Sequence, residues 1–133
     1  MEAVVAAHGG TLEYGWLLWE TIPNVLLEAE FHSVWVTPKG IRRDVTPKEL
    51  GFTRVVYLPD PALTYDGRQI DNKRVPLVDD PLVEEFMALE RRLYGEMNRG
   101  ERADQYGAMP VPMQLAVQLA ELLARISAKY AAT

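Results

Sequence analysis

The absence of cysteine is the feature that most constrains how this chain can fold. None of its 133 residues is a cysteine, so neither a disulfide framework nor a thiolate metal site can hold the structure. The fold must then depend on a hydrophobic core. A chain of this length can bury one, and 48% hydrophobic with 25% charged residues is an ordinary globular composition. We predict a single domain over residues 1–133 that needs no cofactor.

The net charge of the chain limits the classes of partner that we expect. The formal net charge is −5, which disfavours binding to nucleic acid or to an anionic membrane surface. The basic pairs Arg42–Arg43 and Arg91–Arg92 are interpreted as solvated side chains on a strand and a helix. No segment reaches the ~18 apolar residues that span a bilayer, and the N-terminus lacks signal-peptide character. We therefore predict a cytoplasmic protein with no nucleic-acid or membrane partner.

The first half of the chain has the residue pattern of an antiparallel sheet. Alternating apolar and aromatic residues, separated by Pro- and Gly-containing turns, are typical of short strands. A short helical stub over residues 2–7 precedes them and is stopped by Gly9 and Gly10. The Asp66-Gly67 step fits either a small hairpin or a surface loop. The strands are expected at residues 12–20, 25–36, 41–45 and 52–58.

The second half of the chain carries two helical patterns. Asp80 and Pro81 form a strong helix start, and apolar residues at helical spacing continue to about Asn98. A loop rich in Gly and Pro follows, and a second amphipathic helix is expected over residues 113–130. The fold class we predict is α+β: an antiparallel sheet of about four or five strands, with two C-terminal helices and a short N-terminal helix stub.

Two side chains on neighbouring predicted strands, His32 and Asp44, could form a chemical site. If a three-residue loop containing a Gly40 bulge joins the strands, Val36 faces Gly40 and His32 faces Asp44. Their Cβ atoms would then lie about 4.5–5.5 Å apart. The carboxylate could accept a proton from one imidazole nitrogen and leave the other as a base. A satisfied structural pair is the alternative interpretation.

The segment around this pair resembles a known superfamily. The sequence Phe-His-Ser-Val-Trp-Val at residues 31–36, followed by a turn and Asp-Val-Thr-Pro at residues 44–47, is similar to the His-strand and Asp stretch of papain-like and transglutaminase-like proteins. The resemblance covers at most a third of the chain. Residues 58–61 and 65–72 also resemble bacterial proteins of unassigned role.

The resemblance implies a role for each partner and also shows what is missing. His32 would be a general base and Asp44 its orienting group, while the family nucleophile is a cysteine on a helix before the sheet. Here the chain begins inside its helical stub, about where that cysteine is expected. We therefore predict a thiol-free binding module for a peptide or protein. The alternatives are a cysteine-dependent amide hydrolase or acyltransferase whose thiol lies upstream, and a structural subunit that forms homo-oligomers.

Further candidates for binding are aromatic and acidic. Aromatic residues on adjacent strands are more often part of the core, but tryptophans exposed beside His32 would line a pocket. Glu30 lies on the same predicted strand face as His32. The predicted binding residues are Trp16, Trp19, Glu30 and Trp35. A divalent metal held by Glu28, Glu30, His32 and Asp44 is an alternative that mixed nitrogen and oxygen ligands would permit, although we predict no metal site.

Overall fold

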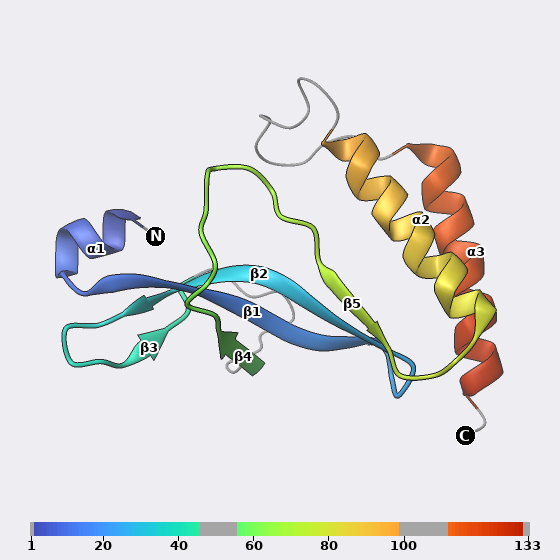
Figure 1. Ribbon diagram of the computed structural model, residues 1–133, viewed down its shortest axis with the longest axis horizontal. Helices are drawn as coiled ribbons and strands as arrows, with labels where there is room; N and C mark the ends of the chain where they lie inside the picture. The colour runs from blue at the N-terminus through green and yellow to red at the C-terminus, as the bar shows by residue number, and fades with distance from the viewer. Residues whose placement is uncertain (1, 46–55, 99–111, 132–133) are drawn as a thin grey trace. The chain divides into compact units, whose positions relative to one another are not determined.

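The computed structural model of the chain describes residues 2–45, 56–98 and 112–131 (Figure 1). It confirms the predicted α+β class, with an antiparallel sheet followed by two long helices. The elements, in chain order, are α1 (Glu2–His8), β1 (Thr11–Ile22), β2 (Leu26–Val36), β3 (Arg42–Arg43), β4 (Val56–Pro59), β5 (Lys73–Pro76), α2 (Pro81–Met97) and α3 (Met113–Tyr130). Within the described ranges, no helix is both long and apolar enough to cross a membrane.

The sheet is built on a long hairpin of β1 and β2. Its strand order is β3-β2-β1-β4, and β5 also pairs with β2. The hairpin turn is closed by a 3.0 Å hydrogen bond from the Val25 N–H to the Ile22 carbonyl, and Asn24 there has a φ of 62°. Asparagine tolerates this left-handed conformation better than most residues. The predicted turn before residue 25 is thus present.

The chain divides into two compact units, and β1 and β2 contribute residues to both. We name Met1–Trp19 with Ala29–Asp66 the sheet unit, and Glu20–Glu28 with Gly67–Thr133 the helical unit. Our prediction of one domain stays a prediction. Each unit is described separately below.

The sheet unit has one aromatic face. Phe31 of β2 packs against Tyr14 and Trp16 of β1, with ring centroids 5.5 and 6.4 Å apart, and Tyr65 stacks on it at 5.4 Å. Leu58 of β4 pairs directly with Trp16 in the antiparallel register. Since directly paired residues share a face, Leu58 lies on this aromatic face.

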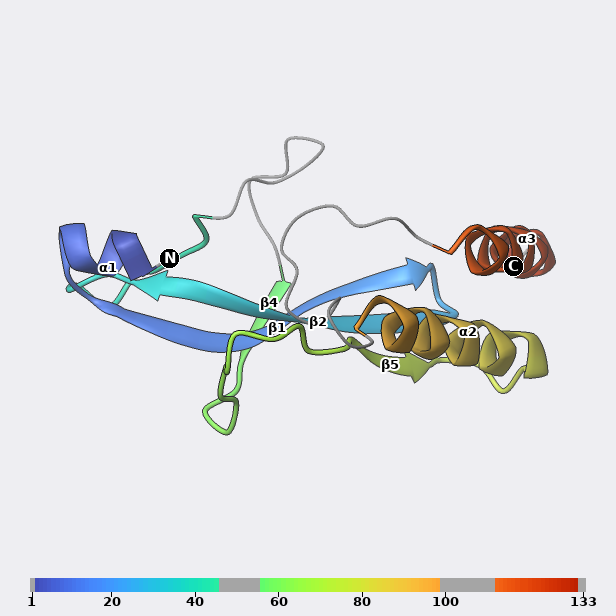
Figure 2. The same ribbon diagram turned by 90° about the horizontal axis from the view of Figure 1, so that it is seen from above.

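The helical unit holds a compact apolar core. Helices α2 and α3 run antiparallel and side by side (Figures 1 and 2), and their facing side chains pack with the tip of the β1–β2 hairpin. Leu26 and Ile126 are completely buried. The core consists of Ile22, Val25, Leu26, Val83, Phe86, Met87, Leu122 and Ile126.

Helix α2 begins as its sequence predicts, and its start is tied to the end of α3. The Asp80 side chain caps the helix by accepting from the Leu82 N–H at 2.9 Å, with Pro81 at the first helical position. Lys129 and Tyr130 of α3 donate to the same carboxylate, each at 2.6 Å. These hydrogen bonds, with that from Lys129 the largest, lower the pKa of Asp80 to about 2.

Several predicted elements need correction. The strand expected at residues 41–45 is paired only at Arg42–Arg43, and residues 52–55 lie outside the described residues. The extended segments expected around Leu63 and Ile70 are not strands, so the surface-loop alternative holds there. The strand β5 comes just after this loop and was not predicted, because only four residues form it and their alternation is short.

Candidate functional site

The structure brings His32 and Asp44 into contact in the sheet unit. Nε2 of His32 lies 3.0 Å from Oδ2 of Asp44, and the two side chains are 14% and 8% exposed. Within the described part of the chain, Nε2 has no hydrogen-bond partner of ordinary geometry. The contact is therefore a close electrostatic pairing of imidazole and carboxylate.

The strand register that produces this contact differs from the one we predicted. Val36 pairs with Arg42 instead of Gly40, because the turn closes one residue later on each side. The Thr37 N–H bonds the Ile41 carbonyl at 2.9 Å, and Gly40 takes a φ of 79° in the three-residue loop between them. A shift by two residues keeps the parity, so His32 and Asp44 stay on one face and meet diagonally.

A second ion pair lies on the same face of the sheet unit. Arg42 donates to both carboxylate oxygens of Glu13, at 2.6 and 3.2 Å. This hydrogen bonding lowers the pKa of Glu13. Burial, with the nearby Glu13 charge as a smaller cause, raises the pKa of Tyr57 to about 12. The face therefore combines imidazole, carboxylate, guanidinium and phenol groups.

Gly15 makes room for Tyr57 on this face. A Cβ atom at Gly15 would lie 2.7 Å from the Tyr57 ring and 2.3 Å from the Leu58 carbonyl oxygen. Both distances are shorter than any van der Waals contact, so the close approach of β4 to β1 requires glycine here.

Two of the four predicted binding residues, Trp16 and Trp35, do not share a strand face with His32. Trp16 is 5% exposed and donates from its indole to Asp60 at 3.0 Å. The Trp35 indole donates to the Gly9 carbonyl at 2.8 Å. Both packed indoles lie on the aromatic-face side of their strands, away from His32. Trp19 is 38% exposed and Glu30 is exposed, so these two remain accessible for contacts.

The metal alternative receives no support from the geometry. Glu28 bonds to Thr21 and Arg74 in the helical unit, whereas His32 contacts Asp44 in the sheet unit. Among residues 2–45, 56–98 and 112–131, no group of three or more His, Asp or Glu side chains is placed to hold a metal ion.

The helical unit contains a buried charge cluster that sequence reasoning missed. Arg74 of β5 is 5% exposed and is surrounded by three carboxylates. Its guanidinium donates to Asp71 at 2.8 and 3.0 Å and to Glu28 at 3.2 Å. Glu90 of α2 lies 3.4 Å from Arg74 Nε. We name Glu28, Asp71, Arg74 and Glu90 the Arg74 cluster.

Glu90 is the electrostatically unusual member of this cluster. Burial is the largest cause that raises its pKa to about 8, and its contact with Glu28 acts in the same direction. The Arg74 charge opposes both but does not overcome them. Glu90 therefore keeps its proton at neutral pH in the folded protein.

A signal for this cluster was present in the sequence. Glu90 follows Phe86 by four residues and precedes Leu93 by three, so helical spacing puts a carboxylate inside the apolar stripe of α2. An acidic residue in such a stripe is buried with a partner or carries a function. Its partner Arg74 could not be identified, because β5 itself was not predicted.

Comparison of the chain with protein-family models, with curated proteins and with solved structures found no match. The resemblance to papain-like and transglutaminase-like proteins therefore stays a prediction. What is established is local: an imidazole–carboxylate pair in the sheet unit and a buried charge cluster in the helical unit.

Proposed function

We propose that this chain is a thiol-free binding module that takes up an extended peptide or protein segment along β4. The observation that carries the proposal is the exposure of apolar side chains on this strand. Val56 is 64% exposed and Leu58 is 55% exposed. Large apolar side chains presented together on a sheet favour a partner over solvent.

The position of β4 explains why the partner would be extended. In the described residues the strand order ends at β4, which pairs with β1 on one side. An edge strand offers backbone N–H and C=O groups to which an extended peptide can add as a further strand. Main-chain hydrogen bonds then supply affinity, and alternate side chains of the peptide supply specificity.

The aromatic face supplies the side-chain contacts. Leu58 shares that face with Trp16, and Tyr65 is 47% exposed while its ring stacks on Phe31. Rigid, half-exposed aromatic rings give large contact area with little loss of side-chain entropy. We expect a peptide with apolar residues at alternate positions, so that one side of it faces Leu58 and Tyr65.

Peptide selection with defined variants tests this proposal. Peptides selected from a randomised heptapeptide library on the intact chain would be resynthesised, and their Kd measured by calorimetry. Leu58→Asp should weaken binding about tenfold or more, because it puts a charge on the apolar contact surface. The matched control is Met113→Asp, which changes a 75% exposed residue of the helical unit. Equal Kd values for wild type and Leu58→Asp would refute the β4 site.

The same strand edge could be occupied by a second copy of the chain, which is the homo-oligomer alternative. Light scattering over a concentration series separates the two cases. If the chain forms a dimer and Leu58→Asp dissociates it, the partner at this strand edge is a second protomer and not a peptide.

The His32–Asp44 contact favours one second candidate, amide hydrolysis or acyl transfer. His32 would act as general base and Asp44 would orient it. The 133 residues contain no cysteine, so the thiol would have to come from outside them. An in-frame cysteine codon shortly upstream in the gene, together with labelling of the longer product by iodoacetamide, would support this candidate. An upstream stop codon would remove it.

A further inference from the structure

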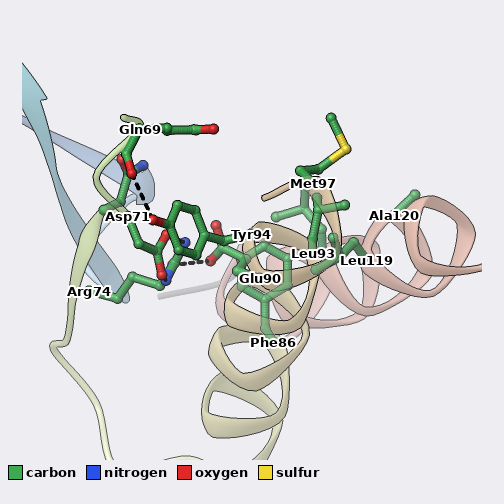
Figure 3. A pocket seen from close by; sticks show the side chains of 12 residues that line it. Gln69, Asp71, Arg74, Phe86, Glu90, Leu93, Tyr94, Met97, Leu119 and Ala120 are labelled. Carbon is green, nitrogen blue, oxygen red and sulfur yellow. Dashed lines mark hydrogen bonds and ion pairs between the residues drawn. The ribbon is translucent and has the colours of Figure 1, made fainter. Parts of the chain in front are cut away.

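The helical unit contains a cavity of about 320 Å³ beside the Arg74 cluster (Figure 3). One part of its lining is apolar and comes from the two long helices, with Leu93 and Met97 on α2 and Leu119 and Leu123 on α3. A cavity of this volume with an apolar wall and a few convergent polar groups has the usual features of a small-molecule site.

The polar end of the cavity is formed by the Arg74 cluster. Asp71, Arg74 and Glu90 line it, and Figure 3 shows the Glu90 carboxyl directed toward Arg74. Tyr94 lies on the same helix as Glu90 and donates to the Gln69 carbonyl at 2.7 Å. Its hydroxyl hydrogen is thus already committed to the protein.

Three of the five N–H donors of Arg74 are also committed. Its guanidinium bonds Asp71 through both Nη atoms and Glu28 through Nε. Glu90 Oε1 is buried and lies 3.4 Å from Arg74 Nε, but among the described residues it accepts no hydrogen bond of ordinary geometry. A donor that enters the cavity could supply that hydrogen bond, and a buried acceptor without one is costly.

The charges decide which donor fits. With Glu90 ionised, three carboxylates face a single guanidinium, so the site has excess negative charge. An anionic ligand would be repelled, whereas an ammonium group supplies both a positive charge and three donors. The apolar wall would receive the hydrocarbon part of the same ligand.

We propose that this cavity binds a small primary amine, with its ammonium group on Glu90 and its apolar tail between Leu93, Met97, Leu119 and Leu123. The site is distinct from the β4 surface and does not depend on the function proposed there.

Binding should release a proton. Burial holds Glu90 protonated near neutral pH by raising its pKa to about 8, whereas the ammonium pairs with the ionised carboxylate. The other charged or titratable groups at this end are Glu28, Asp71, Arg74 and Tyr94. Affinity for the amine should therefore rise by up to about tenfold per pH unit between pH 6 and pH 8, and then level off.

The test uses n-hexylamine, with n-hexanol and hexanoate as probes of equal tail length. Calorimetry gives the affinity, and methyl NMR shifts of Leu93, Met97, Leu119 and Leu123 locate the ligand. Hexylamine should bind at least about tenfold more tightly than hexanol at pH 8, because a charged hydrogen bond is added. Hexanoate should bind most weakly.

Two variants complete the test. Glu90→Gln keeps the shape but removes the charge, and should erase both the preference for hexylamine over hexanol and the pH dependence of binding. Glu84→Gln, an exposed change on the same helix, is the matched control and should preserve both. Equal binding of hexylamine and hexanol by the wild type, methyl shifts elsewhere, or an unchanged hexylamine affinity in Glu90→Gln would each overturn the proposal.

Discussion

The two units of this chain differ in what they bury and what they expose. In the helical unit, Leu26 and Ile126 are inaccessible to solvent at the centre of a continuous core. In the sheet unit, the described apolar side chains that are buried are Trp16 at 5% and Val34 at 3% exposure, while Val56 and Leu58 stay largely exposed. Since burial of apolar surface is the main source of stability, we expect the helical unit to supply most of the stability, and we propose that the sheet unit presents a binding surface.

The largest effect we predict comes from the core of the helical unit. Ile126→Ala removes a side chain with no exposed surface and should lower the free energy of unfolding by about 2–5 kcal/mol. Val117→Ala, at a 46% exposed position on the same helix, should change it by no more than about 0.5 kcal/mol. Urea denaturation followed by far-UV circular dichroism measures both. If both variants lose a similar, small free energy of unfolding, the helical core is not the main source of stability.

The Arg74 cluster should make the free energy of unfolding depend on pH. Burial raises the pKa of Glu90 in the folded protein to about 8, from an ordinary value of 4.5 in the unfolded chain. The folded state thus binds more protons between these values, so stability should fall as pH rises through this window, by at most about 1.4 kcal/mol per pH unit. Above pH 8 this contribution levels off.

Glu90→Gln should remove this contribution and make the stability curve flatter between pH 5 and pH 8. Glu84→Gln should keep the wild-type slope. Denaturation midpoints measured at a series of pH values give the comparison. If the wild-type and Glu90→Gln curves are parallel, the buried carboxyl is not protonated as described.

In the sheet unit, the contact with Asp44 should fix the tautomer of the His32 ring. The proton of the neutral imidazole should lie on Nε2, because a lone pair there would face the Asp44 carboxylate at 3.0 Å. Imidazole ¹⁵N shifts above pH 8 report this tautomer. Asp44→Ala should shift the tautomer population of His32 toward the mixture found in free imidazole. Glu30→Ala, an exposed change on the same strand face, should leave that population unchanged. An unaltered tautomer in Asp44→Ala would show that the pair does not orient the ring.

Patterns that repeat along the chain were predictable from sequence. Asp80 with Pro81 marked the start of α2, and the spacing of apolar residues gave both long helices nearly to their ends. The His32–Asp44 contact was also predictable, because it depends on the parity of the strand pairing and not on the register itself. A register wrong by two residues still put both side chains on the same face.

Contacts between segments far apart in the chain were not predictable in this way. Arg74 meets Glu28 across 46 residues of sequence, through a four-residue strand that has little periodicity of its own. The tryptophans show a related limit. The sequence left open whether they line a groove or belong to the core, and Trp16 is buried, with Leu58 of β4 paired to it and Phe31 against its ring. Burial depends on tertiary neighbours that local pattern does not reveal.

The division of roles between the units is tested most directly by measuring Leu58→Asp for stability and for peptide affinity in the same preparation. We predict a free energy of unfolding within about 0.5 kcal/mol of the wild type, because Leu58 is 55% exposed. The affinity for a selected peptide should fall about tenfold or more. A loss of stability comparable to that of Ile126→Ala, with peptide affinity unchanged, would contradict the account.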